Sequence, residues 1–419
     1  MNNNRATVLF DAIGERVCLP HTLAFLLFPA SLFLVLKFAS AEPYLPHDET
    51  RVLDHLPTNL VALFSNDNKF ESRVKRHTVS PEQWEVLQQN RVTSYLNHAK
   101  ASGDMRYLSY AENRLQNWLQ ETPQSEKARL LDAQIKQYNH NFKAAIQHLE
   151  SLTMNHPKNI EAWSLLANLQ LLTGDYHAAK SSCKQLSARS NLTDSIICQS
   201  NIMIRTGELH KAHKMLRALL VGANTMPVQR QVWLYTSMAE IKLQRNKITQ
   251  AGYYIEKAVK LVADNGLNDN YLSRLHIDYL IQKNNLKQAF ELVRNKKNDS
   301  AMLIRSAVIA KKLGYETNFD MSRIALSQTF EIERRRGLGR HLREQALFTL
   351  LVLNRPAEAF EIAQENWVTQ KEPEDARILL KSALSVGDEA LFQQVQAEIK
   401  NTGLIDLRLD IDYLRGSVI

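Results

Sequence analysis

The chain has few of the residues that build turn-rich or cross-linked folds. Its 419 residues include only 3 Cys, 11 Pro and 13 Gly. So few Gly and Pro count against an all-β fold, which needs a turn about every ten residues. Three Cys exclude a disulfide-dense scaffold and a zinc site with four thiolate ligands. Because 44% of the residues are hydrophobic, the composition also excludes a chain that is disordered throughout.

The sequence also lacks the motifs of common catalytic and metal sites. It contains no Gly-x-Ser-x-Gly, His-Glu-x-x-His or Cys-x-x-Cys motif. His210 and His213 have a helical spacing that could hold one ion, but histidines on helices are more often solvent-facing or packed. The run 337–340 lacks the Gly-Lys-Ser/Thr of a phosphate-binding loop. We therefore expect no enzymatic activity, no metal ion and no cofactor.

One uncharged apolar run, residues 22–36, lies near the N-terminus. Its length suits the core of a signal peptide better than a membrane-spanning helix, which needs about 20 apolar residues. Arg5 and Arg16 precede the run, and a small-residue site ends at Ala41. We expect residues 1–41 to be a signal peptide cleaved after Ala41. An uncleaved N-terminal anchor and a buried cytosolic helix are the alternatives.

A spacing of 34 residues repeats through the first half of the chain. It relates Ala99, Ala133 and Ala167; Leu108, Phe142 and Tyr176; Ala111, Ala145 and Ala179; and Pro123 and Pro157. Each unit reads as two amphipathic helices, for example over 160–172 and 176–188, with a turn between them. Ala suits points where two helices cross closely, and a large ring fills the space beside it. Pro stops the second helix, because it cannot continue the hydrogen-bond ladder.

This pattern resembles the tetratricopeptide repeat, a 34-residue helix–turn–helix unit. The matching residues of one unit are Trp163, Leu166, Ala167, Tyr176 and Ala179. The resemblance implies an all-α fold, a right-handed α-solenoid of about seven or eight helix–turn–helix repeats. We expect an irregular lead-in or cap over 42–80, tetratricopeptide-like repeats over 81–300, and degenerate helical repeats over 301–419.

Two stretches, 103–111 and 365–380, also resemble uncharacterised exported tetratricopeptide proteins of Gram-negative bacteria. This resemblance implies a periplasmic location. If residues 22–36 are not cleaved, the chain is instead anchored in the inner membrane and faces the periplasm. Membrane contact is expected only through residues 22–36.

The tetratricopeptide resemblance implies that one face of the first helices lines a concave groove. The residues at these positions are Lys100, Gln134, Tyr138, Ser164, Asn168, Arg205, Thr236, Glu240, Gln244, Arg274 and Asp278. Most are polar, which suits a protein or peptide partner, although polar residues also coat any wet groove. The implied function is a non-enzymatic interaction scaffold or adaptor. The alternative is a membrane-tethered factor for envelope assembly or biogenesis.

Cys183 and Cys198 remain after signal cleavage. They lie on successive helices, which pack side by side in such solenoids, so in an oxidising compartment they could form a disulfide. The alternative is a pair of buried thiols that act as small hydrophobic residues. The sequence leaves both open.

The stretch 290–345 carries twelve basic and seven acidic residues, a local net charge of +5. This excess suits an anionic partner, or it marks solvated helix faces. We do not expect nucleic acid binding, because an exported chain rarely meets it and the basic residues are not interleaved with aromatic ones.

Overall fold

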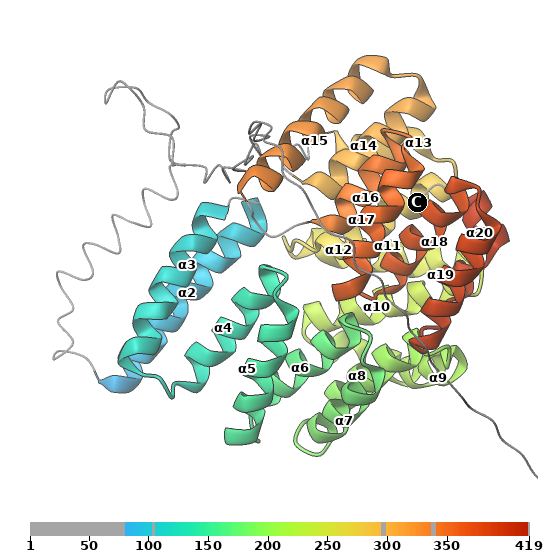
Figure 1. The fold of residues 1–419 in the computed structure, drawn as a ribbon. Helices are drawn as coiled ribbons and strands as arrows, with labels where there is room; N and C mark the ends of the chain where they lie inside the picture. Colours follow the sequence, from blue (N-terminus) through green and yellow to red (C-terminus); the bar gives the residue numbers. More distant parts are fainter. Residues whose placement is uncertain (1–79, 103–104, 295–298, 337–340, 418–419) are drawn as a thin grey trace, which may run out of the picture. The chain divides into compact units, whose positions relative to one another are not determined.

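The computed structural model describes residues 80–102, 105–294, 299–336 and 341–417 (Figure 1). The predicted signal peptide over 1–41 and all but the last residue of the lead-in over 42–80 lie outside these ranges. Every described residue belongs to one of the chain's two units, Ala62–Ile419. Within the described ranges the chain forms helices and no strand, apart from an isolated bridge between Thr206 and Ile405. The all-α prediction is confirmed.

The helices pack in consecutive pairs along the chain (Figure 1). The first five pairs are α2 (Pro81–Ser102) with α3 (Met105–Glu121), α4 (Glu126–Tyr138) with α5 (Phe142–Asn155), α6 (Ile160–Leu172) with α7 (Tyr176–Ser187), α8 (Leu192–Arg205) with α9 (Leu209–Leu220), and α10 (Val228–Gln244) with α11 (Ile248–Asp264). The next four are α12 (Asn270–Gln282) with α13 (Leu286–Val293), α14 (Ser300–Leu313) with α15 (Glu316–Arg336), α16 (Leu342–Leu351) with α17 (Pro356–Thr369), and α18 (Pro373–Val386) with α19 (Glu389–Asn401). The 3-10 helices η2 (Ala223–Thr225) and η3 (Leu407–Leu409) and the short α20 (Ile411–Gly416) complete the described elements. This arrangement confirms the predicted solenoid of helix pairs, and the described ranges hold nine pairs where about seven or eight were expected.

The turn inside each pair after α2–α3 contains one residue with a left-handed backbone. These residues are His140, Gly174, Gly207, Asn246, Asn284, Gly314, Asn354 and Gly387. Gly and Asn reach this conformation at low cost, which ends the first helix and reverses the chain. In several pairs the next residue then caps the second helix: the Asp175 carboxylate, for example, accepts from the Ala178 N–H at 2.9 Å.

The alanines of the 34-residue spacing lie where helices cross. Ala133, Ala145, Ala167 and Ala179 are all fully buried. The aromatic residue Phe142, at the position equivalent to Tyr176, is buried beside them. The register inferred from these small residues is therefore the register in which the helices pack. Among the described helices, none is both long and apolar enough to cross a membrane.

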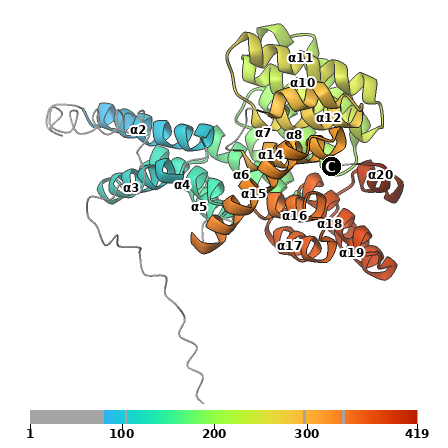
Figure 2. The same ribbon diagram turned by 90° about the horizontal axis from the view of Figure 1, so that it is seen from above.

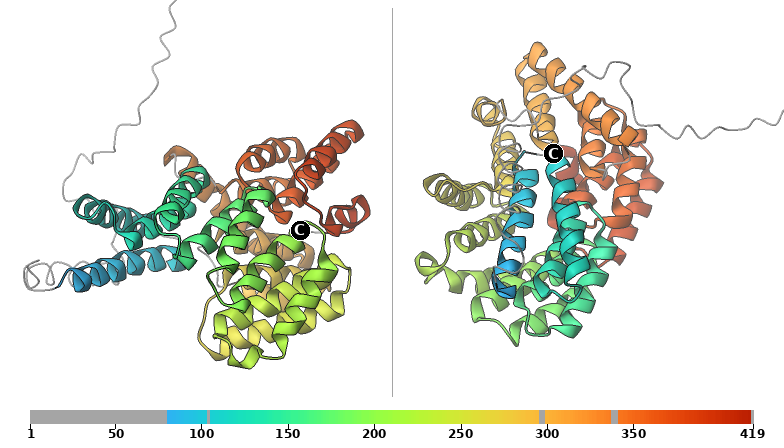
Figure 3. Two further views of the ribbon diagram at one scale, coloured as in Figure 1. Left: turned by 90° about the horizontal axis from the view of Figure 1, so that it is seen from below. Right: turned by 90° about the vertical axis from the view of Figure 1, so that its left-hand side faces the viewer.

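Two segments of the C-terminal part, one before α18 and one after α19, contact helices much earlier in the chain. The backbone N–H of Lys371 donates to the carbonyl of Leu172, the last residue of α6, at 2.8 Å. The N–H of Ile405 donates in the same way to Arg205, the last residue of α8, also at 2.8 Å. Figures 2 and 3 show this part of the fold from other sides, with red helices beside green ones. The solenoid therefore folds back on its own middle repeats.

Candidate partner-binding groove

Nine of the eleven residues predicted to line the groove fall into two groups. Of the other two, Ser164 on α6 is half-buried, and Thr236 on α10 is buried and donates to the Val232 carbonyl at 2.8 Å. The first group is Lys100 on α2, Gln134 and Tyr138 on α4, and Asn168 on α6. Lys100 and Asn168 are exposed, and Gln134 and Tyr138 are half-buried. The Tyr138 hydroxyl donates to the carbonyl of Ala99 at 3.2 Å, and burial raises the pKa of Tyr138.

The second group contacts other parts of the same chain. Its members are Arg205 on α8, Glu240 and Gln244 on α10, and Arg274 and Asp278 on α12. The Gln244 amide donates to the carbonyl of Ile204 at 3.4 Å, and Glu240 accepts a hydrogen bond from the Tyr271 hydroxyl. The Arg274 guanidinium lies over the Tyr271 ring, 5.9 Å from its centre.

Two residues of this second group pair with charged side chains from later repeats. The Arg205 guanidinium lies 3.4 Å from the Glu372 carboxylate, which precedes α18. Asp278 accepts two hydrogen bonds from Arg305 on α14, at 2.6 and 2.7 Å. Both contacts occupy the face that the repeat pattern assigns to a partner, so this part of the groove is filled by the chain itself.

Arg343 on α16 is the centre of the charged contacts. Its guanidinium forms two hydrogen bonds with Asp375, at 2.6 and 2.7 Å, and one with Glu372 at 2.8 Å. The Asp375 side chain is fully buried, and the Asn366 amide donates to it at 2.7 Å. Asp375 also accepts from the Glu372 N–H at 3.0 Å, which completes a capping box at the start of α18.

Glu374 links this centre to Arg305. It lies 3.4 Å from Arg343 and 3.8 Å from Arg305. Burial alone would raise the pKa of Glu374, but the charges of Arg343 and Arg305 outweigh it and lower the pKa to about 2. The Glu374 carboxylate is therefore ionised near neutral pH. Burial raises the pKa of Asp375 despite the opposing charge of Arg343.

The sequence did not predict this ion-pair network. Arg305 and Arg343 belong to the basic stretch 290–345, for which an anionic partner or a solvated helix face was expected. Arg305 is only 1% exposed and faces its own chain. Other arginines of the stretch are exposed but paired, such as Arg323 with Asp320 at 3.0 Å. The acidic run 372–375 at a helix start was the available signal, because carboxylates favour helix N-termini.

The middle and last repeats touch at equivalent turns. A Cβ atom added to Gly174 would lie 2.9 Å from the Lys371 side chain, and one added to Gly207 would lie 2.7 Å from Ile405. One repeat earlier, the Gln370 amide nitrogen Nε2 donates to Nδ1 of His140 at 3.2 Å. The glycines are needed here both for the turn and for the close approach of another segment.

The His140 ring also meets His341 edge-on, with ring centres 5.5 Å apart. Burial and the nearby charges of His341 and Arg343 lower the pKa of His140 to about 4. A hydrogen bond with Glu333, opposed by burial, raises the pKa of His341. His140 is therefore neutral near neutral pH, while His341 is the more readily protonated ring.

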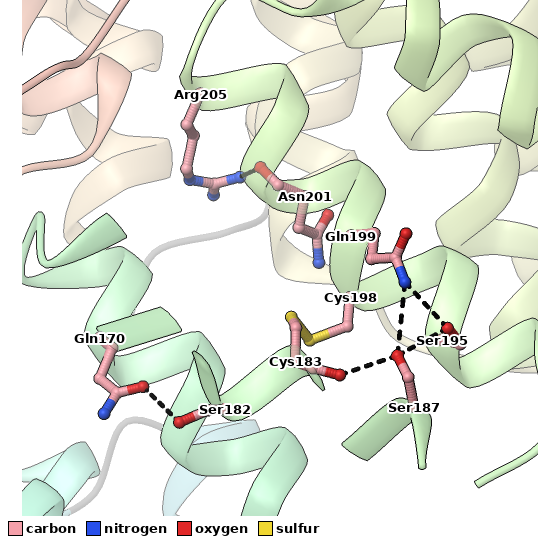
Figure 4. Close-up of a disulfide and its surroundings, with 9 residues drawn as sticks. All are labelled: Gln170, Ser182, Cys183, Ser187, Ser195, Cys198, Gln199, Asn201 and Arg205. Atoms are coloured by element: carbon pink, nitrogen blue, oxygen red, sulfur yellow. Dashed lines mark hydrogen bonds between the residues drawn. A yellow bond between two sulfur atoms is a disulfide. The ribbon is translucent and has the colours of Figure 1, made fainter. Parts of the chain in front are cut away.

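The structure joins Cys183 on α7 to Cys198 on α8 in a disulfide (Figure 4). Both residues are buried, and their Cα atoms are 5.6 Å apart. The Ser187 hydroxyl is hydrogen-bonded to the Ser195 hydroxyl at 2.6 Å and donates to the Cys183 carbonyl at 2.8 Å. The bridge and these bonds fasten the third helix pair to the fourth.

Histidines and acidic residues do not gather into a metal site in the described ranges, where no group of three or more could hold an ion. Of the two spaced histidines, His213 lies 3.0 Å from the Lys242 amine. Burial and the charge of Lys242 lower the pKa of His213. The expected absence of a metal or cofactor stays a prediction.

Comparison with known proteins supports the repeat assignment. Residues 136–195 match the family model described as tetratricopeptide repeat. They run from the end of α4 to the start of α8, where the 34-residue spacing is clearest. The resemblance to this repeat is confirmed, and such repeats are generally non-enzymatic scaffolds for protein interaction. No curated protein matches the sequence.

Several solved structures are similar to this chain at low sequence identity. The pilF protein of Pseudomonas aeruginosa is 15% identical, covering 49% of this chain and 92% of that one, with a TM-score of 0.36. A tetratricopeptide repeat protein from Parabacteroides merdae is 14% identical, with coverages of 62% and 98% and a TM-score of 0.39. Human IFIT1, solved as a dimer with PPP-AAAA, is 13% identical, with coverages of 82% and 78% and a TM-score of 0.48.

Proposed function

We propose that this chain is a non-enzymatic adaptor of the periplasm, and that its first three helix pairs bind a protein partner. One observation carries the proposal. Lys100, Gln134 and Asn168 lie at groove positions, and within the described chain none of their three side chains makes a hydrogen bond or ion pair. The later groove residues contact other parts of the chain, and two of them, Arg205 and Asp278, pair with charged side chains of later repeats. We therefore assign partner recognition to α2, α4 and α6.

The chemistry of these positions suits an extended peptide segment. The Gln134 and Asn168 amides can each donate and accept, which matches the alternating groups of a peptide backbone. Lys100 adds one positive charge, which favours an acidic residue in the partner. The partner class is therefore a protein segment with polar and acidic character.

The disulfide supports the proposed compartment. Disulfides persist in oxidising compartments and are rare in the cytosol. Cys183 and Cys198 lie at a bridging distance on packed helices, which agrees with an exported chain. The second candidate function is a membrane-tethered envelope assembly factor in which residues 22–36 are not removed. The N-terminal residue of the mature protein distinguishes the two, since Glu42 is expected for the soluble adaptor.

Site-specific photo-cross-linking in the periplasm tests the proposal. A photoreactive amino acid at Gln134 or Asn168 should capture one defined partner band. The matched control places the same amino acid at Lys143 or Lys180, which are exposed on the second helices α5 and α7. Equal capture from both faces, or no capture from the first helices, would contradict the assignment of the partner site.

A further inference from the structure

A cavity of about 330 Å³ lies inside the folded-back part of the solenoid. Residues of α10 and α12 form one wall, and residues of α16, α18 and α20 form the other. The two walls come from helix pairs that meet only because the last repeats return to the middle ones. The volume falls in the range of small-molecule binding sites.

Most of the cavity wall is apolar. The aliphatic side chains that line it include Leu243, Leu275, Leu347, Leu350, Ile378 and Leu414. Five of these six are buried in the structure. Such a wall favours an apolar ligand body, because the ligand leaves water on entry.

One cation in the cavity, Lys381, has no partner of opposite charge among the residues that the structure describes. The Lys381 amine donates to the backbone carbonyl of Ser417 and lies 3.3 Å from its hydroxyl. Across the described ranges no carboxylate comes within ion-pair distance of this amine. Arg377 also lines the cavity, and its Nη1 atom is buried without a hydrogen bond, 3.6 Å from the nearest carboxylate oxygen of Asp406.

The other charges that line the cavity are mostly neutralised. Asp278 and Glu374 are paired with Arg305. The Arg408 guanidinium donates hydrogen bonds from Nε and Nη2 to the Asp406 carboxylate. Asp412 on α20 is the remaining acid of the lining, and it is exposed to solvent. The interior therefore holds an uncompensated positive charge beside an apolar wall.

We propose that this cavity binds a small monocarboxylate with an apolar tail, whose carboxylate accepts hydrogen bonds from Lys381 and Arg377. The aliphatic side chains surround the tail. This site is separate from the partner groove on α2, α4 and α6 and does not rest on the proposed adaptor function.

The titration of Lys381 gives the site a characteristic pH dependence. Burial and the charge of Lys312 lower the pKa of Lys381 to about 8. Above that pH the amine is neutral and no longer attracts a carboxylate. Binding should therefore weaken as the pH rises from 7 to 9.5, although the carboxylate itself stays ionised throughout.

Titration calorimetry on the full mature chain tests the proposal, with octanoate as the probe. Octylamine and 1-octanol share the tail and replace the carboxylate. Octanoate should bind, and the two analogues should bind at least roughly tenfold more weakly, the effect of losing a charged hydrogen bond. Equal binding of all three, or no binding of octanoate, would overturn the proposal. A short peptide that binds through a free C-terminal carboxylate where octanoate does not would overturn it as well.

Variants distinguish the effect of the Lys381 charge on octanoate binding from any effect of its replacement on folding. Lys381→Met should lose octanoate binding, whereas Lys381→Arg keeps the charge and should retain it. Asp412→Asn, the matched control at the cavity rim, removes a negative charge and should leave binding equal or tighter. If Lys381→Met does not fold, the pH series on the unmodified chain decides. Octanoate affinity that is unchanged between pH 7 and 9.5 would exclude the role of Lys381.

Discussion

The backbone N–H of Lys371 closes the end of α6 by donating to the Leu172 carbonyl at 2.8 Å. The last carbonyl groups of a helix accept no hydrogen bond from within that helix. A backbone N–H from another repeat can therefore donate to them. Ile405 supplies the same bond to Arg205 at the end of α8. Two C-terminal segments thus supply donors to α6 and α8, the first helices of two consecutive pairs in the middle of the solenoid.

Replacing Gly207 tests the close approach of Ile405 to the turn between α8 and α9. In Gly207→Ala, the backbone has φ +79° and the new Cβ would meet Ile405 at 2.7 Å. Gly314→Ala is the matched control, because its φ is +72° and no atom lies within 4 Å of the new Cβ. We expect Gly207→Ala to lower the free energy of unfolding by roughly 1–3 kcal/mol more than Gly314→Ala, the usual cost of overpacking. Equal losses in urea denaturation would show that the segments do not touch.

Removing Arg343 should be far more damaging than removing an exposed arginine. Arg343→Met leaves Asp375 and Glu372 without their main partner in a buried setting. Breaking a buried pair on one side costs about 3–5 kcal/mol. Arg335→Met is the control, because Arg335 pairs with Glu331 on the surface and should contribute less than about 1 kcal/mol. Similar losses for the two variants, measured by chemical denaturation, would contradict the network described above.

The disulfide should stabilise the chain by a measurable amount. It closes a loop with a sequence separation of 15 residues, for which the chain-entropy estimate is about 3 kcal/mol. The double variant Cys183→Ala with Cys198→Ala should lose this amount in urea denaturation. Adding a reductant should destabilise the unmodified chain similarly and leave the double variant unaffected. Mass spectrometry of thiol-blocked, non-reduced protein should find neither cysteine alkylated, and two alkylated thiols would refute the bridge.

Acidification should weaken the contact at His140. Its pKa is lowered to about 4 in the folded chain, against an ordinary value of 6.5, so the folded state favours the neutral ring. The stabilising contribution is therefore complete above pH 6.5 and is lost as the pH falls toward 4. The raised pKa of His341 acts in the opposite direction, which is why a variant is needed to isolate the effect.

His140→Asn is that variant. Asn holds the same left-handed turn position at Asn246, Asn284 and Asn354, so the turn should be preserved while the titrating ring is removed. Between pH 7 and 5, the variant should lose less unfolding free energy than the unmodified chain. An identical pH dependence for both would mean that His140 is not buried against the last repeats.

The repeat architecture could be predicted from the sequence because it depends on local signals. The first helix expected over 160–172 is α6, and the second, expected over 176–188, is α7 within one residue. Ala at the crossing points and Gly, Asn or Asp at the turns carry this information. The pair of α14 and α15 was harder to delimit, because α15 runs over 21 residues and lacks the aromatic and alanine pattern.

The return of the last repeats could not be predicted, because it depends on contacts between residues far apart in the chain. Lys371 and Ile405 contribute backbone N–H groups, which every residue except proline possesses, so no side-chain pattern marks them. In the sequence, Arg305 and Arg343 belong to a basic stretch. Their acidic partners lie on other helix pairs, so the sequence does not show that these arginines are paired. The groove residues Arg205 and Asp278 were placed on the expected face, but that face is covered by the same chain.

Hydrogen exchange at two backbone amides tests the central claim that the C-terminal repeats close over the middle of the solenoid. The N–H groups of Lys371 and Ile405 lie outside helices, and their acceptors belong to α6 and α8. If the fold closes as described, both amides should exchange far more slowly than in the unfolded chain, at rates typical of helical amides. Exchange of both at unfolded-chain rates, while α6 and α8 remain protected, would show that the solenoid is open and contradict the account.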